Sequence, residues 1–264
     1  MPRFKLTIEY QGTRYSGWQV QKNARTVQGE ILAALRKATG KMEPELYGSG
    51  RTDAGVHALR QAAHLDLPDA AQPETLRRNL NMELPSDINI LAIERAHPRF
   101  HARHHAVARS YLYQVSRRRT AFGKKLTWWV KEDLDVERIR RAAALFAGMK
   151  NCQSFSADEP EEKSTRVLIE RVQVREAGDL ILIRVEGSHF LWRMVRRIVG
   201  VLVEAGKGKL SHTEIARFLE GKSEEPARLA APASGLFLER VYYAGDARQE
   251  DLEPVLLISS PTMR

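Results

Sequence analysis

The 264-residue sequence contains a single cysteine, Cys152, so no disulfide bond can form within the chain. It has no run of about 18 apolar residues, the length that a membrane-spanning helix needs. The first ten residues, MPRFKLTIEY, lack the apolar segment of a secretory signal peptide. Together these absences favour a reducing compartment, and we expect a cytoplasmic protein.

Acidic residues are too few to balance the basic ones. The 33 Asp and Glu stand against 42 Lys and Arg, which gives a formal net charge of +9. Such an excess favours a polyanionic partner such as nucleic acid, although a basic ribosome-associated protein or a thermophile protein could show the same excess. Hydrophobic residues make up 43% of the chain, which excludes disorder as its main state.

The first hundred residues follow the order β-α-β-β-α-β. Phe4, Leu6, Ile8 and Tyr10 alternate with polar residues, which predicts a half-buried strand over 3–10. Thr26 can cap a helix that ends at Gly40. The remaining elements expected here are strands at 45–47, 61–67 and 87–96 and a helix that begins at Pro73.

The second half repeats this order without obvious sequence identity. The expected elements are strands at 110–116, 166–175, 180–186 and 236–243, helices at 136–146 and 190–205, and an inserted helix at 212–219. Two such units in succession predict an α+β fold of two ferredoxin-like halves around a largely antiparallel sheet. We expect an N-terminal half at 1–104, a C-terminal half at 105–245 and a C-terminal tail at 246–264.

The most unusual segment is the glycine-rich stretch 48–58, GSGRTDAGVHA. It lies between two expected strands and lacks both the Lys-Ser/Thr of a phosphate-binding P-loop and the third glycine of a dinucleotide fingerprint. Its glycines let the backbone approach a ligand closely, and it presents the carboxylate of Asp53 beside the guanidinium of Arg51. The alternative is a tight turn in which the aspartate bonds only to local backbone.

Two other positions are candidate binding residues. Arg196 falls at the border of the apolar face of the helix expected at 190–205, where its stem can run along the core edge toward a cleft; the alternative is a surface arginine. Tyr111 and Tyr113 share one face of a strand that follows a basic run from Arg99 to Arg109, as in proteins that stack RNA bases; the alternative is two core aromatics.

Other chemistries find little support. The histidines at 97, 101, 104 and 105 fit no metal-site spacing, so we expect no metal. No G-x-S-x-G nucleophile elbow is present. Lys207 and Lys209 are expected to end the long helix, where they can also contact phosphate.

Several blocks of the sequence, taken in order, resemble one known family, the TruA-type tRNA pseudouridine synthases. The likeness covers nearly the whole chain, and its most specific block is GRTDAGVHA at 50–58. The other blocks are IEYQGTRYSGWQVQ, TVQGE, LNMELPSDI, FHAR, RSYLY, FLWRMVRRIVG and APASGLFLERVYY.

The resemblance implies an isomerase that detaches a uridine of tRNA at its glycosidic bond and rejoins it through carbon 5, with no cofactor. The family's targets are positions 38, 39 and 40 of the anticodon stem-loop, and its members are homodimers. By correspondence Asp53 is the essential carboxylate and Arg196 its partner. Arg51 would occupy the space that the flipped base vacates, Tyr111 would pack against the uracil, and Leu236 would form the apolar floor of the pocket.

Two other functions remain to be weighed against this one. A non-catalytic RNA-binding protein of two ferredoxin-like units would use the basic run and Tyr111 but would not need Asp53. A carboxylate-dependent glycosidase usually needs two carboxylates that flank the bond, and the glycine-rich loop offers one.

Overall fold

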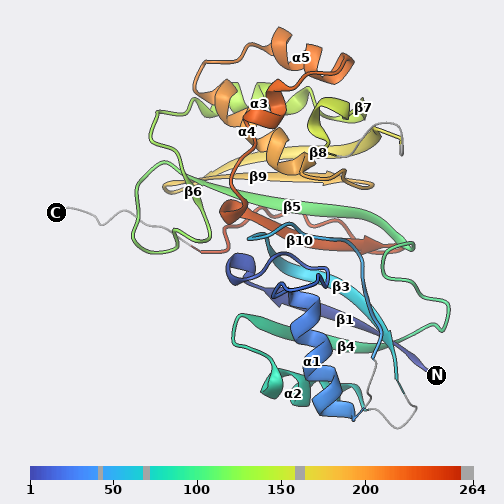
Figure 1. The fold of residues 1–264 in the computed structure, drawn as a ribbon. Coiled ribbons are helices and arrows are strands. Elements are labelled where there is room, and N and C mark those ends of the chain that lie inside the picture. The colour runs from blue at the N-terminus through green and yellow to red at the C-terminus, as the bar shows by residue number, and fades with distance from the viewer. Residues whose placement is uncertain (41–43, 68–71, 158–163, 257–264) are drawn as a thin grey trace. The chain divides into compact units, whose positions relative to one another are not determined.

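The computed structural model describes residues 1–40, 44–67, 72–157 and 164–256 (Figure 1). The chain forms two compact units: unit 1 is Met1–Val107 with Phe237–Asp246, and unit 2 is Ala108–Leu236 with Ala247–Arg264. The first boundary lies close to the expected one at 104/105. The expected C-terminal half ran on to 245, however, whereas most of the last strand belongs to unit 1 and the segment after it belongs to unit 2.

Unit 1 contains the first predicted β-α-β-β-α-β repeat. Its elements are β1 (Arg3–Tyr10), η1 (Gly12–Arg14), α1 (Val27–Thr39), β2 (Leu46–Gly48), β3 (His57–Asp66), α2 (Pro73–Glu83), β4 (Ile88–Ala96) and most of β10 (Leu236–Tyr243). The order β4-β1-β3-β2 is antiparallel throughout, as in a ferredoxin-like sheet. Strand β10 adds a short parallel pairing to the start of β3, with Phe237 opposite His57.

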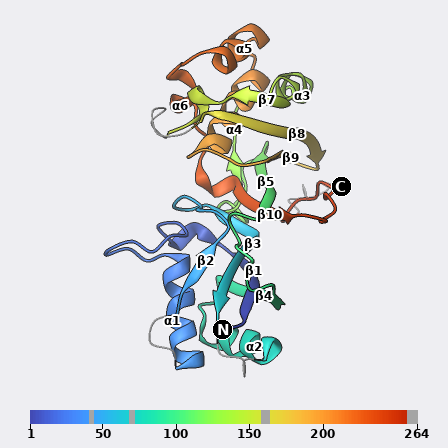
Figure 2. The same cartoon turned by 90° about the vertical axis from the view of Figure 1, so that its right-hand side faces the viewer.

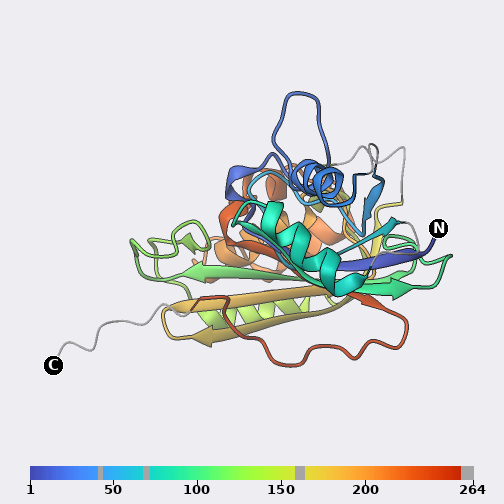
Figure 3. The ribbon, with the colours of Figure 1, turned by 90° about the horizontal axis from the view of Figure 1, so that it is seen from below.

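Local sequence explains where these elements begin and end. The alternate residues of β1 are buried, in the predicted pattern. Thr26 caps α1 by accepting a hydrogen bond from the Gly29 amide at 3.2 Å, and Gly40 ends it in a left-handed conformation at φ 66°. The buried side of α1 carries Ile31 and Leu35, and α1 and α2 lie on one side of the sheet of unit 1 (Figure 3).

The sheet of unit 2 has the antiparallel order β5-β9-β8-β7, and β6 adds a short parallel pairing with β5. Its strands are β5 (Ala106–Ser116, with its first two residues in unit 1), β6 (Trp128–Trp129), β7 (Gly148–Asn151), β8 (Arg166–Ala177) and β9 (Leu180–Gly187). Figure 2 shows β7, β8 and β9 side by side. Its helices are α3 (Val136–Ala144), α4 (Met194–Gly206), α5 (His212–Glu220) and α6 (Glu225–Arg228), with η2 (Gln153–Phe155) and η3 (Ala233–Gly235).

The two sides of this sheet differ in polarity. Ile183 and Val185 of β9 lie opposite Tyr113 and Tyr111 of β5, so all four side chains share one side. Arg184, between them in sequence, points to the other side. It is fully buried there and donates hydrogen bonds to the carbonyls of residues 249–251.

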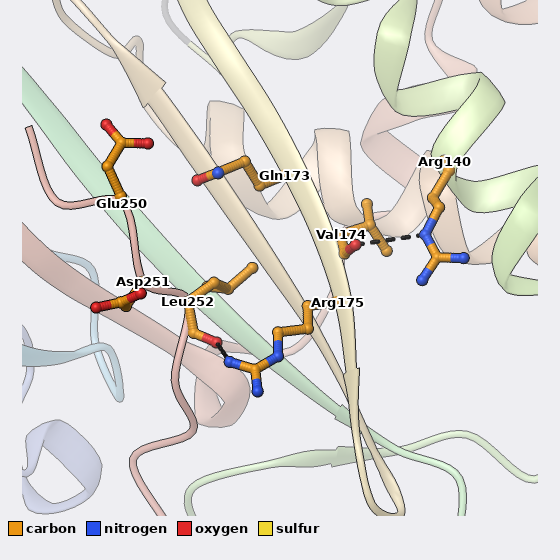
Figure 4. A pocket seen from close by; sticks show the side chains of 7 residues that line it. All are labelled: Arg140, Gln173, Val174, Arg175, Glu250, Asp251 and Leu252. Atoms are coloured by element: carbon orange, nitrogen blue, oxygen red, sulfur yellow. Dashed lines mark hydrogen bonds between the residues drawn. The ribbon is translucent and has the colours of Figure 1, made fainter.

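The segment after β10 therefore packs against the polar side of β8 and β9. Leu252 is buried, and the Val255 amide donates to Oε1 of Gln114 at 2.7 Å. A hollow of about 490 Å³ opens between this segment and β8, where Arg175 donates to the Leu252 carbonyl at 2.7 Å (Figure 4). It is lined by charged groups of both signs and contains none of the predicted site residues. From Ala247 to residue 256 the expected tail is thus part of unit 2, and its carbonyls are the acceptors of the buried Arg184 on β9.

The α+β class and the largely antiparallel sheet are confirmed. The short elements β6, β7 and α6 were not predicted. Within the described residues, no helix is both long and apolar enough to span a membrane.

Candidate active site

The loop that carries Asp53 connects β2 to β3 in unit 1 and is fastened at its first residues to β3. The Ser49 amide donates to the Ala62 carbonyl at 2.8 Å, and Ser49 Oγ donates to Oε1 of Gln61 at 2.7 Å. Gln61 in turn donates from Nε2 to the Gly50 carbonyl at 3.0 Å. Both side chains are buried, so their bonds exchange little with water.

A second set of contacts holds the middle of the loop. The Trp18 amide donates to the Thr52 carbonyl at 3.1 Å, and the hydroxyls of Tyr10 and Thr52 are hydrogen-bonded at 2.8 Å in the interior. The Gly55 amide donates to the Tyr15 carbonyl at 3.3 Å. The segment 10–18, which is distant from the loop in sequence, therefore holds the backbone on both sides of Asp53.

Two glycines make this close approach possible. Gly17 has φ +94°, and a Cβ atom there would lie 2.5 Å from the Thr52 carbonyl oxygen. A Cβ atom at Gly48 would lie 2.6 Å from Nε1 of Trp18. Any side chain at either position would push the two segments apart.

The loop buries its backbone and presents its charges. Thr52 is buried, Asp53 is half-buried and Arg51 is exposed. A local turn does exist, because the Val56 amide donates to the Asp53 carbonyl at 3.1 Å and Gly55 has φ 79°. The contacts from Trp18, Tyr10 and Gln61 go far beyond what a simple turn needs.

The two tyrosines of β5 in unit 2 differ in their burial. Tyr113 is fully buried and donates from its hydroxyl to the Pro232 carbonyl at 2.8 Å, so it is a core residue. Burial raises the pKa of Tyr113 well above its ordinary value. Tyr111 is half-buried and packs edge to face on Phe190, with ring centroids 5.1 Å apart.

Arg196 is held by the chain that leads into β10. Its Nε donates to the Ala231 carbonyl at 2.7 Å, and the Ala231 amide donates to the Arg196 carbonyl at 2.9 Å. The same segment continues through Gly235, where a Cβ atom would lie 2.6 Å from the ring of Tyr113, to the buried Leu236. Residues 231–236 thus link Arg196, Leu236 and the tyrosine side of β5 within unit 2.

The helix that carries Arg196 begins later than predicted. The expected span was 190–205, but α4 starts at Met194, because Arg193 adopts a left-handed conformation at φ 60°. Arg197 is half-buried and donates to the carbonyls of Ser154 and Ser156, which compensate for its burial.

The predicted site residues therefore come from both units. Asp53 and Arg51 belong to unit 1, whereas Tyr111, Arg196 and Leu236 belong to unit 2. Sequence reasoning missed the residues that hold the loop, chiefly Gln61, Thr52 and Trp18. An available signal was the tryptophan in a polar stretch, since a large aromatic side chain there needs something to pack against.

Histidines in and beside the basic run accept hydrogen bonds from nearby backbone amides. Nδ1 of His101 accepts from the amides of Arg103 and His104, and Nδ1 of His64 on β3 accepts from the Ala102 amide at 3.1 Å. Across the described ranges, no group of three or more His, Cys, Asp or Glu side chains is arranged to hold a metal ion.

The lysines after α4 are paired with carboxylates. Nζ of Lys207 lies 2.9 Å from Glu204 and 3.4 Å from Glu132. Lys209 lies 3.7 Å from Glu132. Both lysines do mark the end of α4, as expected, but these ion pairs weaken the expectation that they contact phosphate.

Comparisons with known proteins agree on one family. The family model described as tRNA pseudouridine synthase matches residues 6–105 and 142–244. The chain is 38% identical over 246 residues to the tRNA pseudouridine synthase A 2 of Bacillus anthracis, which covers 92% of this chain and 100% of that protein. It is also 38% identical to the tRNA pseudouridine synthase A of Paramagnetospirillum magneticum, over 92% of this chain and 96% of that one, and to that of Agrobacterium fabrum, over 92% and 93%. The chain belongs to the tRNA pseudouridine synthase family, a family of isomerases.

Proposed function

We propose that this enzyme converts uridine to pseudouridine in the anticodon stem-loop of tRNA, at one or more of positions 38, 39 and 40, with Asp53 as its essential carboxylate. The observation that carries the proposal is the Asp53 loop, whose backbone is held from both sides while the carboxylate stays accessible. A rigid, pre-positioned group is what a reaction at one defined atom requires.

The reaction balances without a cofactor. The bond between N1 of uracil and C1′ of ribose breaks, the base rotates, and a bond forms between C5 and C1′. The proton on C5 leaves and N1 gains one, so the product is an isomer of the substrate. Asp53 can attack the ribose, attack the base, or assist elimination to a glycal, and each route needs the same carboxylate.

The target base has to leave its stack before it can react. Flipping costs a few kcal/mol. A side chain that fills the vacated space and contacts to the extruded base can offset this cost. The exposed Arg51, two residues before Asp53, is suited to fill the vacated space. Tyr111 offers a half-buried ring already oriented by Phe190, against which a uracil can pack.

The proposal is tested with Asp53→Asn, which keeps the size of the side chain and removes the charge. The substrate is an unmodified tRNA transcript tritiated at C5 of uridine, because only isomerisation through C5 releases that label. We expect the variant to bind tRNA as the parent does and to release no tritium. Asp133→Asn, at an exposed aspartate of unit 2, is the matched control and should retain full activity.

The outcomes separate the three functions. Turnover of Asp53→Asn within tenfold of the parent would exclude Asp53 as the essential group. Binding without tritium release by the parent would favour the non-catalytic RNA-binding protein. Release of free uracil would favour a glycosidase.

Tyr111 is tested by a pair of substitutions. Tyr111→Ala removes the ring and should lower kcat by a factor that corresponds to about 1–3 kcal/mol of stacking. Tyr111→Phe keeps the ring and reports any role of the hydroxyl in proton transfer or hydrogen bonding. Unchanged turnover in Tyr111→Ala would remove this residue from the base pocket.

The partners follow from the same proposal. We expect tRNA to be the macromolecular substrate and the enzyme to act as a homodimer, as the family resemblance implies. Sedimentation equilibrium measures the oligomeric state directly, and a monomer at working concentration would contradict the second expectation.

A further inference from the structure

Unit 2 contains a segment in which positive charge is concentrated far above the chain average. Residues 117–131, the basic loop, contain six cations and no acidic residue, in a chain whose total net charge is +9. The cations are Arg117, Arg118, Arg119, Lys124, Lys125 and Lys131. In Figure 1 the basic loop is the green segment beyond the end of β5, and it includes β6.

Aromatic side chains lie exposed among these cations. Phe122 is 87% exposed and Trp129 is 41% exposed. The guanidinium of Arg119 lies 5.8 Å from the centre of the Trp129 ring. Trp128, by contrast, packs against the buried Tyr113 of the core, so the two adjacent tryptophans have different surroundings. Exposed rings beside cations are the combination with which proteins bind bases and phosphates together.

The backbone around Phe122 is ordered by hydrogen bonds, although the Phe122 side chain is exposed. The Phe122 amide donates to Oγ1 of Thr120 at 3.1 Å, and the same hydroxyl donates to the Phe122 carbonyl at 2.9 Å. Nε2 of Gln114 on β5 donates to the Leu126 carbonyl at 2.9 Å, and the Val130 amide donates to the Ser116 carbonyl at 3.0 Å. A loop ordered in this way loses little conformational entropy on binding.

Arg117 and Arg118 anchor the loop, whereas Arg119, Lys124 and Lys131 form no ion pair within the described residues. Arg117 pairs with Glu176 at 2.7 Å, and Arg118 pairs with Asp179 at 2.9 Å. Among the described residues, no carboxylate lies within ion-pair distance of Arg119, Lys124 or Lys131. These three exposed side chains therefore carry charge that the surface of unit 2 does not neutralise.

We propose that the basic loop is a second RNA-binding surface, which holds the substrate tRNA at a distance from the uridine that reacts. The proposal rests on the proposed function in taking tRNA as the substrate. The loop starts six residues after Tyr111 on β5, about 20 Å along the strand direction at about 3.4 Å per residue. Stacked bases rise about 3.4 Å per step, so the loop reaches RNA some six steps or more from the flipped base.

The family model does not match this surface. The family model matches residues 6–105 and 142–244, and the basic loop lies between these two stretches. The chemistry favours RNA over an anionic membrane, because planar rings beside arginine suit base stacking, whereas membrane binding needs a continuous apolar face.

The test neutralises together the three cations that form no ion pair within the described residues, in the full-length protein, as Arg119→Gln/Lys124→Gln/Lys131→Gln. The matched control is Arg217→Gln/Lys222→Gln/Arg228→Gln, which removes the same charge from exposed sites on and near α5 and α6 of the same unit. Binding of tRNA is measured against salt concentration, and kcat and KM are measured by tritium release.

We expect the loop variant to raise the Kd for tRNA tenfold or more at about 0.1 M salt. Its slope of log K against log salt should fall by about 2 to 3, because each lost phosphate contact removes about 0.7 to 0.9. KM should rise with kcat unchanged, since the loop does not touch the reacting uridine. The control should keep the parent slope.

Phe122 separates stacking from general apolar contact. Phe122→Ala and Phe122→Leu should both weaken tRNA binding about tenfold with no change in the salt slope, because leucine has no aromatic face. Full binding by Phe122→Leu would exclude base stacking at this position.

Each contrary result has a definite meaning. An unchanged Kd and slope in the triple variant would overturn the proposal. The proposal would also be overturned if the triple variant bound tRNA as the parent does and lost binding only to vesicles that contain phosphatidylserine. If the parent binds tRNA but releases no tritium, the proposed function fails, while the Kd and salt slope of the variants still decide whether the basic loop binds RNA.

Discussion

Lowering the pH from about 7.5 to about 5 should destabilise the fold through His64, a histidine of β3. Its side chain is 2% exposed, and its Nδ1 accepts a hydrogen bond from the Ala102 amide at 3.1 Å. An imidazole that accepts at Nδ1 is neutral there and carries its proton on Nε2. Burial, together with the nearby positive charges of Arg3 and His101, lowers the pKa of His64 from 6.5 to about 4, whereas Asp66 acts in the opposite direction.

The size of the effect follows from this difference in pKa. Above pH 6.5 the imidazole is neutral in both states, so its protonation does not change the free energy of unfolding. Between pH 6.5 and 4 the unfolded chain binds a proton that the folded chain excludes, and stability falls by up to about 1.4 kcal/mol per pH unit. The loss is about 2 kcal/mol at pH 5 and about 3 kcal/mol when the folded pKa is reached. The neighbouring Asp66 has a lowered pKa and loses its own contribution only at lower pH.

The assay compares urea unfolding of the parent and His64→Gln at about pH 7.5 and pH 5. Glutamine can still accept from the Ala102 amide but does not titrate. The variant should therefore lose about 2 kcal/mol less than the parent between the two pH values. His212→Gln, at an exposed histidine that begins α5, is the matched control and should lose as much as the parent.

An equal loss in the parent and in His64→Gln would refute this reasoning. It would mean that the imidazole is protonated in the folded state without penalty, so that the burial of His64 against the 97–105 segment does not control its charge.

Three further predictions concern single side chains. Gly48→Ala should cost about 1–3 kcal/mol of stability by urea unfolding, because its methyl group would meet the ring of Trp18, and it should lower kcat by displacing the Asp53 loop; an unchanged midpoint would show that the loop yields easily. Arg196→Lys keeps the charge but lacks the Nε that donates to Ala231, so kcat should fall more than tenfold by tritium release, and full activity would exclude a positioned guanidinium. Burial raises the pKa of Cys152 to about 12, so iodoacetamide at pH 8 should label it only after unfolding, as mass spectrometry would show; rapid labelling of the native protein would contradict its burial.

The sequence alone determined features that depend on neighbouring residues. The alternation of Phe4, Leu6 and Ile8 defined β1, and the Thr26 cap with Gly40 defined both ends of α1. Such signals are readable because the physics acts within one turn of helix or one step of strand. The spacing of the glycines around Asp53 likewise indicated, from neighbouring residues alone, a loop whose backbone can approach a ligand closely.

Features that depend on distant segments were decided only by the tertiary structure. Nothing near Gly48 in the sequence shows that Trp18 lies against it, or that Gln61 holds the loop from β3. The late start of α4 at Met194, after Arg193 turns left-handed, was likewise hidden behind an unbroken apolar pattern.

The buried charges show the physical reason most clearly. Arg184 stands in the middle of an apolar strand, and its burial is possible only because the carbonyls of residues 249–251 accept its protons. Arg197 is half-buried for the same reason, with Ser154 and Ser156 as its acceptors. The sequence shows which charged residue will need hydrogen-bond acceptors if it is buried. It does not show which distant segment supplies those acceptors, because that depends on the packing of the whole unit.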